Sequence, residues 1–376
     1  MDRKDQPIEI VGAGPSGLVA AMTLAHHGYR VIVHEERSDV GHRFHGDFQG
    51  LENWSSREDV TDLLQRMGIK INFLCQPYRE GDLYDPDLRK VTVRSFEPFF
   101  YLVRRGSEAG TLDYGLKAQA LEAGVEFVFN KRVEKLPEGG IVAIGPKVAD
   151  AIVKGVLFET ELPDMAVAIG DDRLAPKGYA YLLVHQGRAT LATVILREFR
   201  REKEFYKKTL AAFQKIVPLD MKHPREFGGY GNFSIRPTEQ RSGKLYVGEA
   251  AGFQDALFGF GIRYAIMSGH LAARAIIEGK DYDRLWRHEL LPQLRTGLVN
   301  RFLFELFGNG GYRRLADYIG RSRDPRELVR RQCNPSLLKR LLYPVTYPFY
   351  LRRSRFRDYS CSHEDCDCVW CRCQRE

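Results

Sequence analysis

The sequence predicts an α/β fold in which a parallel-sheet domain carries an inserted α+β sheet domain and is followed by a helical C-terminal part. Three observations predict this class. Residues 7–36 follow the order strand, Gly-rich turn, helix and strand. Residues 244–278 return to a strand, a Gly-rich turn and a helix, and the strand-like runs at 78–103 and 151–200 lie between these two segments. The first domain is therefore expected to be discontinuous in sequence.

The individual helices and strands are predicted from the spacing of apolar residues and from the glycines that end them. Apolar runs predict strands over 7–12, 29–36 and 125–130, and apolar residues at helical spacing predict helices over 17–28, 58–68, 112–124 and 261–278. From residue 284 the chain becomes helical, aromatic and basic. We expect four parts: a first domain formed by 1–77, 101–150 and 236–280, a sheet domain for the substrate formed by 78–100 and 151–235, a helical basic region at 281–358, and a Cys-rich tail at 359–376.

Composition excludes several classes of protein. The chain has 376 residues, of which 44% are hydrophobic and 28% are charged, and this balance excludes a disordered chain or a small disulfide scaffold. The first residues are charged where a signal peptide would be apolar, and the sequence lacks a run of about 18 apolar residues that could span a bilayer. Five of the seven cysteines crowd the last sixteen residues. We therefore expect a protein of the reducing cytoplasm.

The first chemical motif is VGAGPSG, which places Gly12, Gly14 and Gly17 in the pattern GxGxxG, with Pro15 and Ser16 at the start of the helix. The first glycine permits the tight turn, the second lets the backbone approach a pyrophosphate, and the third lets the helix pack closely on the strand. The helix N-terminus then faces the phosphates. Since the motif follows a strand and opens a helix, it predicts a dinucleotide site rather than a structural turn.

Two carboxylates end the second strand of this unit. Glu35 and Glu36 lie where a carboxylate can accept hydrogen bonds from the hydroxyl groups of a ribose. This position suits either NAD or FAD, so the first motif alone leaves the cofactor open.

The segment GKLYVGEAAGFQDALFGFGIRYAIMSGHLAARAI, residues 243–276, resembles the second FAD-binding segment of the flavoproteins that include aromatic hydroxylases and geranylgeranyl reductases. Gly248-Glu249 stands for the Gly-Asp pair that contacts the ribityl and pyrophosphate part of FAD in that family, with Glu replacing Asp. Gly259, Gly261 and Ile262 lie where the family opens a helix toward the flavin pyrimidine. The resemblance implies FAD and a Rossmann-like FAD-binding domain of the glutathione-reductase type, with an inserted antiparallel sheet.

The order of motifs over residues 7–280 looks most like the geranylgeranyl reductase family. Those reductases carry a YxWxFP-type motif on a strand that faces the substrate, and here Tyr179 keeps its place, Tyr181 stands for the Trp, and Leu183-Val184 replaces Phe-Pro. The resemblance implies reduction of C=C bonds in the prenyl chain of an apolar lipid or quinone by hydride transfer from reduced flavin. The structural alternative is that both tyrosines are ordinary residues of a sheet core.

The proton donor for such a reaction is open. Some reductases of this family carry a cysteine near the flavin at the position of residues 45–50, where this chain has HGDFQG and no cysteine. His45 and Asp47 are the polar side chains there. We therefore name Tyr179, Tyr181 and His45 as candidate catalytic residues, while His45 also fits a surface or packing role.

Three further positions come from the same resemblance. In similar flavoproteins an Arg before the mid-chain helix reaches the FAD phosphate or ribityl region, and Arg105 occupies this position. Arg43 resembles a second Arg that lies along FAD. Val133 is located where relatives hold the adenine by backbone contacts. A surface role is the alternative for both arginines.

The source of electrons is also open. Since a second GxGxxG is absent from the sequence, we expect no separate nicotinamide domain, and either NAD(P)H or a reduced ferredoxin would supply the flavin. Two other functions share these FAD motifs. One is a flavin monooxygenase of the aromatic hydroxylase type, and the other is a non-catalytic flavin-containing binding protein at a membrane.

The tail has the composition of a metal site. Five thiols and one imidazole lie within thirteen residues, and these suit zinc. The candidate ligands are Cys361, His363, Cys366, Cys368, Cys371 and Cys373. The spacing is not a regular pair of CxxC motifs, so a reduced, metal-free tail is the alternative.

Positive charge is concentrated near the C-terminus. Residues 313–357 hold thirteen Lys or Arg and three acidic residues, a net charge of +10 in a chain whose total is +8. Aromatic and apolar residues interleave with these cations, which suits an anionic membrane at the inner face of the cell. Pro344 and Pro348 are expected to preclude one continuous helix there. Nucleic acid is disfavoured because no nucleic-acid module accompanies the charge, and a solvated basic surface is the remaining alternative.

Overall fold

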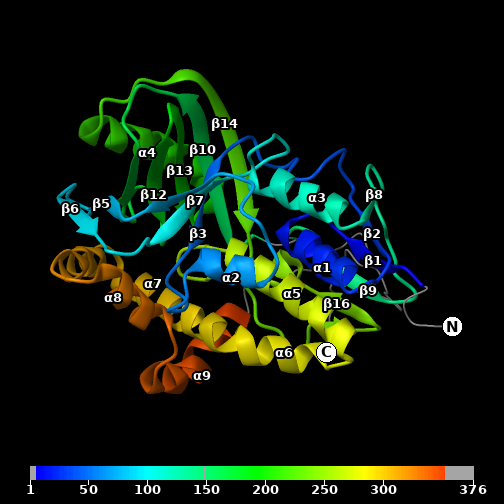
Figure 1. Ribbon diagram of the computed structural model, residues 1–376. Helices are drawn as coiled ribbons and strands as arrows, with labels where there is room; N and C mark the ends of the chain where they lie inside the picture. The colour runs from blue at the N-terminus through cyan, green and yellow to red at the C-terminus, as the bar shows by residue number, and fades with distance from the viewer. Residues whose placement is uncertain (1–5, 147–148, 352–376) are drawn as a thin grey trace.

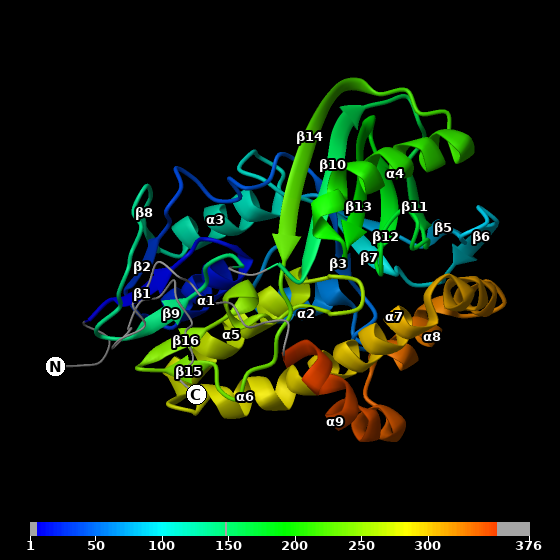
Figure 2. The same ribbon diagram turned by 180° about the vertical axis from the view of Figure 1, so that it is seen from behind.

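The computed structural model describes residues 6–146 and 149–351 and confirms the predicted fold class. Figures 1 and 2 show a parallel sheet on one side, a larger antiparallel sheet above it, and a row of C-terminal helices along the bottom. A smaller three-stranded sheet joins these parts. Each of the two predicted nucleotide segments lies in the parallel-sheet part.

The parallel sheet has six strands in the order β15-β16-β9-β1-β2-β8. Its strands are β1 (Ile8–Val11), β2 (Val31–His34), β8 (Glu126–Val128), β9 (Gly140–Val142), β15 (Gln240–Arg241) and β16 (Lys244–Tyr246). All neighbours are parallel except β15 and β16. Since β1 is central and both its neighbours are parallel, the turn after it opens at the carboxyl edge of the sheet, where cofactors bind in open α/β sheets.

Three helices pack on this sheet: α1 (Pro15–His26), α3 (Leu112–Glu122) and α5 (Ile262–Glu278). Nine consecutive residues of α1, from Ser16 to Leu24, are buried. This explains its run of small and apolar residues, because α1 is covered by both α3 and α5. A Cβ on Gly269 of α5 would lie 2.1 Å from the carbonyl oxygen of Ser16. A glycine is therefore required at position 269, where α5 meets α1. The two residues in contact, Ser16 and Gly269, are 253 positions apart in the sequence.

The antiparallel sheet has seven strands in the order β14-β10-β13-β12-β11-β5-β6. The strands are β5 (Glu80–Tyr84), β6 (Lys90–Arg94), β10 (Ala151–Glu159), β11 (Met165–Ile169), β12 (Tyr179–His185), β13 (Arg188–Ile195) and β14 (Lys222–Gly231). Only β5 and β11 pair in parallel. The edge strand β14 was not predicted from the sequence, because it contains Pro224 and three glycines; an edge strand tolerates such residues since one side needs no partner.

One face of this sheet is covered by α4 (Glu202–Ile216), which follows the short 3₁₀ turn at Phe199–Arg201 (Figure 2). This helix was not predicted from the sequence either. Its buried residues are Phe205, Tyr206, Thr209, Ala212 and Phe213, at the spacing of one helical face. The helix and the sheet thus enclose a second hydrophobic core.

The three-stranded sheet connects the two larger ones. It consists of β3 (Phe48–Glu52), β4 (Cys75–Tyr78) and β7 (Phe100–Arg104) in the order β3-β7-β4, and α2 (Val60–Arg66) lies between β3 and β4 in sequence. The backbone N–H of Phe48 on β3 donates a hydrogen bond to the side-chain oxygen of Thr190 on β13. The Tyr78 hydroxyl on β4 donates to the carbonyl oxygen of Val184 on β12. These bonds attach the antiparallel sheet to the three-stranded sheet.

Within the described residues, four helices form the C-terminal region: α6 (Tyr282–Glu289), α7 (Leu291–Gly320), α8 (Pro325–Cys333) and α9 (Leu337–Leu351). A kink at Gly308, where φ is +50°, divides α7. No helix in the described ranges is both long and apolar enough to cross a membrane. The basic region is therefore a set of packed helices that run under both sheets (Figure 1).

The prediction that Pro344 and Pro348 would preclude one continuous helix is wrong, because both lie inside α9. Both prolines are on the exposed side of the helix. On the opposite side, Tyr343, Tyr347 and Tyr350 pack against the main core at spacings of four and three. Tertiary packing of this face stabilises α9 against the unfavourable propensity of the prolines.

Candidate functional site

The turn after β1 has the geometry of a pyrophosphate cradle. A Cβ on Gly12 would lie 2.5 Å from the carbonyl oxygen of Ala143, and one on Gly17 would lie 2.1 Å from the carbonyl oxygen of Gly12. Both glycines are thus needed for close packing. A Cβ on Gly14, by contrast, would meet no atom within 4 Å, so the space above this residue is open. The three glycines therefore have the separate roles that the motif predicts.

The N-terminus of α1 faces the same open space. Gly14 is its N-cap and has no side chain to satisfy the first backbone N–H groups, and Pro15 occupies the first turn. Ser16 is buried, beside the position that a Cβ on Gly248 would occupy. An anionic group at this end of the helix would accept hydrogen bonds from the free donors and interact favourably with the helix dipole.

Glu35 lies at the carboxyl end of β2, next to the turn. Its two carboxylate oxygens accept hydrogen bonds from the backbone N–H groups of Ala13, at 2.9 Å, and of Arg37, at 3.0 Å. These bonds orient the carboxylate against the glycine turn. Glu36 lies 3.6 Å from Arg132 in an ion pair, next to Val133, which packs against the main core. The residues predicted for the adenosine end of the cofactor are therefore adjacent to one another.

The second glycine segment returns to the same edge. Gly248 and Glu249 follow β16, and the Gly248 N–H donates to the hydroxyl oxygen of Ser268 on α5 at 2.9 Å. Gly259, at φ +77°, leads to Gly261, which is the N-cap of α5 and again has no side chain. Ile262 is the first helical residue and is buried. Two helix N-termini without side-chain caps thus open at the same edge of the sheet.

Arg43 reaches across this edge. Its guanidinium pairs with the carboxylate of Glu249 at 2.6 Å and lies 3.4 Å from the position that a Cβ on Gly145 would occupy. About half of the Arg43 side chain is exposed. Glu249, which is longer than the Asp of the family motif, therefore has a cationic partner in Arg43. Sequence reasoning assigned both residues to the cofactor, but separately.

Arg105 is held by protein partners. Its Nε and Nη2 donate to the two oxygens of Asp113 on α3, both at 2.8 Å, and its Nη1 donates to the Gln49 side chain at 3.0 Å. The guanidinium also lies 4.0 Å from the centre of the Phe44 ring. Asp113 and Gln49 were missed by sequence reasoning, because neither belongs to a motif and only the fold brings them together.

The two tyrosines of β12 lie beside the second glycine turn. The Tyr179 hydroxyl donates a hydrogen bond to the carbonyl oxygen of Phe258 at 2.6 Å, and the Tyr179 and Tyr181 rings are 6.1 Å apart. Burial raises the pKa of both hydroxyls well above the ordinary value for tyrosine. Both groups are therefore protonated at neutral pH. No described residue bonds the Tyr181 hydroxyl, although the charge of Asp47 acts on it.

An aromatic cluster surrounds this turn. Trp54 packs edge-on against Phe260 at 4.8 Å and against Phe258 at 6.5 Å, and Phe258 contacts Phe304 of α7 at 6.4 Å. Together with Tyr179 and Tyr181 these rings come from four separate stretches of the chain. We call these six residues the aromatic cluster. The sequence motifs included the two tyrosines and the two phenylalanines of the glycine turn, but they gave no indication of Trp54 or Phe304, which lie far away in the sequence.

His45 and Asp47 differ in their surroundings. His45 is exposed, and its ring contacts Arg225 of β14 at 3.3 Å. Asp47 is buried, and its oxygens accept hydrogen bonds from the His45 backbone N–H and from the Gln49 side chain. Asp47 is therefore the member of this pair that lies within the protein near Tyr181.

A buried arginine of α7 forms a hydrogen bond with the glycine turn that precedes α5. Arg301 of α7 has no exposed side-chain surface, and it donates hydrogen bonds to the carbonyl oxygens of Leu257 and Lys177. Its Nε lies 3.4 Å from Glu305. Arg301 thereby ties the glycine turn, the segment before Tyr179 and α7 together. No sequence motif pointed to a functional residue in α7, because a buried arginine has no local signal.

Asp255 stabilises the same turn. Its carboxylate accepts hydrogen bonds from the backbone N–H groups of Leu257, at 3.2 Å, and Phe258, at 2.7 Å. Burial raises the pKa of Asp255 to about 6, in spite of these two bonds. The carboxyl group therefore titrates near neutral pH in the folded protein.

These residues fit FAD. Open space above Gly14 admits a pyrophosphate, and two uncapped helix N-termini supply donors. Glu35 is oriented at the ribose position, and the aromatic cluster lies at the turn that the family places next to the flavin. Hydrogen-bond donors at one end and apolar rings at the other correspond to the two ends of this cofactor.

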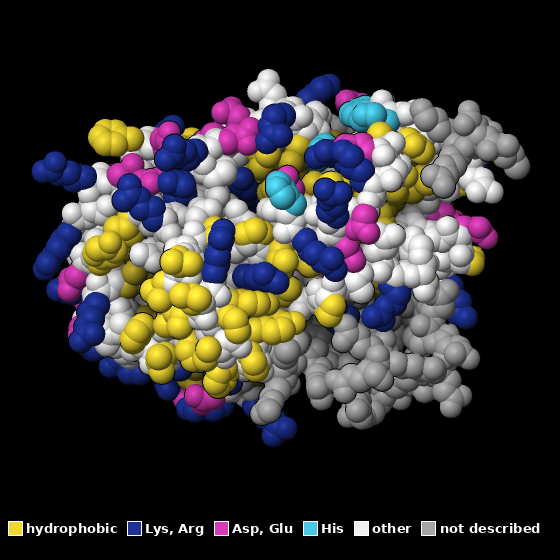
Figure 3. Space-filling model, turned by 90° about the horizontal axis from the view of Figure 1, so that it is seen from below, with side chains coloured by type: hydrophobic (Ala, Val, Ile, Leu, Met, Phe, Trp, Pro, Cys, Tyr) yellow, Lys and Arg dark blue, Asp and Glu magenta, His cyan; other side chains and the backbone are white. Residues whose placement is uncertain are grey.

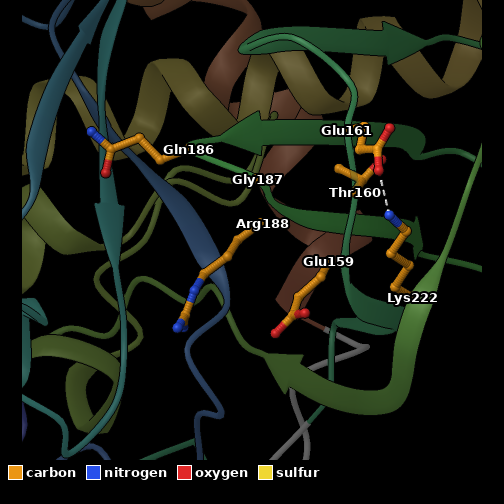
Figure 4. Close-up of a pocket in the computed structure, with 7 residues that line it drawn as sticks. All are labelled: Glu159, Thr160, Glu161, Gln186, Gly187, Arg188 and Lys222. Carbon is orange, nitrogen blue, oxygen red and sulfur yellow. Dashed lines mark hydrogen bonds and ion pairs between the residues drawn. The ribbon is translucent and has the colours of Figure 1, made fainter.

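A separate surface hollow of about 280 Å³ lies at the far edge of the antiparallel sheet (Figure 4). Its lining residues are Glu159, Thr160, Glu161, Gln186, Gly187, Arg188 and Lys222. Lys222 pairs with Glu161, and the lining is polar. It therefore lacks the apolar character expected of a site for a prenyl chain.

The predicted metal ligands belong to the tail. Those residues, from Cys361 to Cys373, lie outside the described residues. Within residues 6–146 and 149–351, no group of three or more His, Cys, Asp or Glu side chains is arranged to hold a metal ion.

Comparison with known sequences connects the chain to reductases over most of its length. The profile described as an NAD(P)-binding Rossmann-like domain matches residues 10–50. Digeranylgeranylglycerophospholipid reductase from Methanocaldococcus jannaschii is 24% identical, over 88% of this chain and 96% of that protein. The protein of the same name from Methanosphaerula palustris is 23% identical, over 76% of this chain and 82% of its own length.

Solved structures agree on the fold. A geranylgeranyl bacteriochlorophyll reductase-like protein from Thermoplasma acidophilum superposes with a TM-score of 0.67 at 18% identity, covering 92% of this chain and 98% of that one. A flavin-dependent brominase gives a TM-score of 0.62 at 14% identity, covering 93% and 100% of the two chains. These structures carry the flavoprotein fold, and the sequence relatives narrow the assignment within it. By sequence and fold together, the chain is similar to reductases of the geranylgeranyl type, and its fold is that of the FAD-dependent oxidoreductases to which it was compared.

Proposed function

We propose that this protein is an FAD-dependent oxidoreductase that reduces isolated C=C bonds in the prenyl chain of a lipid. The observation that carries the proposal is the similarity to digeranylgeranylglycerophospholipid reductases, which extends over both sheets rather than over the cofactor motif alone. Reduced FAD supplies the hydride for one carbon of the double bond, and a protein group or water supplies the proton for the other.

The cofactor is held by the residues at the carboxyl edge of the parallel sheet. The first turn with Gly14 would receive the pyrophosphate, Glu35 the ribose, and Arg43 with Glu249 the ribityl region. Arg105 is already bonded to Asp113, so we propose that it orients the segment at Gln49. Gly261, at the start of α5, would place the helix N-terminus against the flavin.

The substrate side is formed by the sheet domain, residues 78–100 and 151–235. An isolated alkene is unpolarised, so the protein contributes mainly by placing it against the flavin and by excluding water. The aromatic cluster supplies the apolar surface for this placement. Its rings come from β12 of the sheet domain, from the glycine turn before α5, from α7 and from the segment after β3, so the cluster joins the sheet domain to the glycine turn.

We propose Tyr181 as the proton donor. Its hydroxyl is protonated at neutral pH because burial raises its pKa, and no described residue forms a hydrogen bond with it. Tyr179 instead donates its hydrogen bond to the carbonyl oxygen of Phe258, so it acts as a positioning residue for the turn. His45 is exposed and its ring contacts Arg225, so we assign the proton to Tyr181 rather than to His45.

Anaerobic single-turnover kinetics tests the proposal. The protein is reduced with dithionite and mixed with a geranylgeranyl-ether lipid; flavin absorbance near 450 nm should return, and mass spectrometry should show two added hydrogens per reduced bond. Tyr181→Phe should slow this reoxidation by about 100-fold, the typical effect of losing a general acid, while leaving flavin content unchanged. Tyr179→Phe is the matched control, with a smaller expected effect on rate.

The alternative functions predict different results. A monooxygenase of the aromatic hydroxylase type would consume O₂ and release a hydroxylated product, and a non-catalytic flavoprotein would leave the prenyl lipid unchanged. Reoxidation of the flavin by O₂ alone, with no saturated lipid formed, would overturn the reductase assignment. The relatives favour the reductase over the monooxygenase, since the halogenase and oxygenase neighbours match in fold only.

The electron donor and two peripheral features complete the proposal. NAD(P)H or a reduced ferredoxin would reduce the flavin, and stopped-flow reduction with each donor distinguishes them. We propose a cytoplasmic protein whose basic C-terminal region touches an anionic membrane. The tail from Cys361 to Cys373 would hold one zinc; elemental analysis of the full chain against a chain ending at Tyr359 should show that zinc lost with the tail.

A further inference from the structure

Helix α9 exposes an apolar face although it lies on the surface. The exposed large hydrophobic residues of this helix are Leu337, Leu338, Leu341, Val345 and Phe349, with exposed fractions between 54% and 74%. Pro344 and Pro348 are exposed on the same side. At 100° per residue these seven positions cover less than half of the helix circumference. Arg340, at the edge of this arc, is the only charged residue among the exposed residues of α9 that the structure describes.

Helix α7 extends this surface. Phe349 contacts Phe302 of α7 with ring centres 5.2 Å apart, and Leu306, one turn further along α7, is 66% exposed. Phe307 is 59% exposed next to it. We call the seven exposed residues Leu306, Phe307, Leu337, Leu338, Leu341, Val345 and Phe349 the apolar face. Figure 3 shows hydrophobic side chains gathered over the underside of the molecule, where these helices lie in Figure 1.

The opposite side of α9 is already packed. Tyr343, Tyr347 and Tyr350 contact the main core, and the Tyr347 hydroxyl donates to the carbonyl oxygen of Ile235 at 2.8 Å. Thr346 is buried between them. The apolar face is thus not a core surface that the helix has failed to bury, because the helix is held by its other side. A contiguous apolar area of this kind on a protein surface marks an interaction site.

Positive charge borders the apolar face. Arg340 and Arg295 are both exposed, and the Arg295 guanidinium lies over the Tyr343 ring at 4.9 Å. Figure 3 shows Lys and Arg side chains around the hydrophobic area. Residues 328–357 contain eight Lys or Arg and no Asp or Glu. This combination of apolar centre and cationic border complements an anionic lipid surface.

We propose that the apolar face of α7 and α9 docks on an anionic phospholipid bilayer, with α9 lying in the plane of the interface. A second copy of the chain would place the same cationic border against itself, and a bilayer of anionic lipids avoids that repulsion. The inference rests on the membrane contact proposed above and deepens it, because it assigns that contact to the apolar face rather than to the basic residues alone. It needs neither substrate nor turnover, so its failure would leave the proposed reaction untouched.

The two prolines set the depth of docking. A proline has no N–H, so the carbonyl oxygens of Arg340 and Pro344 lack their usual helical donors at positions 344 and 348. Such groups need water or another donor, which the hydrocarbon interior does not offer. The helix therefore docks at the level of the headgroups, where leucine and phenylalanine side chains reach the acyl region and the backbone stays hydrated.

Vesicle flotation tests the proposal with the full chain. The probes are phosphatidylcholine vesicles with and without phosphatidylglycerol. At low salt the wild-type protein should float with the anionic vesicles only, and it should stay bound at about 0.5 M salt, where screening weakens the arginine contacts. The double variant Leu341→Gln/Val345→Gln should bind at low salt but lose about tenfold of its bound fraction at high salt. Phe96→Gln is the matched control, because Phe96 is 87% exposed on another part of the molecule.

Folding and self-association are measured on the same samples. Both changed residues are exposed, so flavin content and melting temperature should match those of the wild type. The proposal is overturned if the wild-type protein ignores anionic vesicles at low salt, or if the double variant keeps its binding at high salt. It is also overturned if light scattering shows a wild-type dimer that the double variant dissociates, because the apolar face would then join two copies.

Discussion

The two glycine turns of the parallel sheet and the C-terminal helices hold their functional groups in different ways. At the turns the backbone itself forms the site, through open space above Gly14 and two helix N-termini. In the helices the surroundings of each side chain differ: Arg301 of α7 is fully buried, while Arg340 of α9 is exposed. A local motif can therefore specify the first kind of site, whereas the second kind depends on which side of a helix the body covers.

The largest effect is expected from a substitution in the first glycine turn. Gly14→Val should abolish flavin binding while the protein stays folded, because the new side chain enters open space where the pyrophosphate must lie. Absorbance at 450 nm and heat-released FAD measure the loss, and circular dichroism measures the fold. A yellow Gly14→Val protein would contradict this assignment of the turn.

Gly17→Val is the matched variant for that experiment. A Cβ at Gly17 would lie 2.1 Å from the carbonyl oxygen of Gly12, so the change should destabilise the domain itself by overpacking, at a cost of about 3 kcal/mol or more. The pair thus separates loss of cofactor from loss of fold. If both variants are equally folded and equally yellow, the two glycines do not have distinct roles.

An intermediate effect is expected at the buried arginine. Arg301→Met should lower the free energy of unfolding by about 4 kcal/mol, since it leaves the carbonyls of Leu257 and Lys177 without their donor and removes the ion pair with Glu305, which keeps its hydrogen bond from Arg197. Arg340→Met should change it by less than about 0.5 kcal/mol, because Arg340 is exposed. Urea denaturation measures the free energy of unfolding of both variants. Equal values for the two would show that the buried and the exposed arginine do not differ in their contribution to stability.

The smallest expected effect concerns pH. Burial raises the folded-state pKa of Asp255 from 3.8 to about 6, so the folded protein binds this proton more readily than the unfolded chain does. The stability that this group contributes is present below pH 4 and is lost as the pH rises to 6. Relative to the wild type, Asp255→Asn should therefore gain about 2 kcal/mol between pH 4 and pH 6, since each pKa unit corresponds to about 1.4 kcal/mol.

Urea denaturation at several pH values measures this difference. Burial also raises the pKa of Asp150 to about 6. Because Asp150 is present in both proteins, its effect on the free energy of unfolding cancels when the variant is compared with the wild type. A constant difference between Asp255→Asn and the wild type over this range would show that Asp255 has an ordinary pKa in the folded protein.

Local sequence pattern was sufficient for much of the fold. The βαβ unit with its GxGxxG turn, the second segment from Gly248 to α5, and the sheet inserted between them follow from periodicity and glycine spacing, and the structure confirms this class. The helix α4 and the edge strand β14 were missed. The first lies in a run of charged residues, and the second contains proline and glycine, so neither has a strong propensity and both depend on packing against the sheet.

The sequence by itself determined the glycine turns, the fold class and the basic character of the C-terminal region, because each of these depends on residues that are close together in the chain. Only the tertiary structure decided that Arg105 meets Asp113, that Arg301 bonds to the glycine turn before α5, and that Trp54, Phe258 and Phe304 join Tyr179 in one cluster. It also decided that α9 continues through both prolines. These outcomes depend on contacts between distant segments, whose free energies exceed the local preferences from which a sequence can be interpreted.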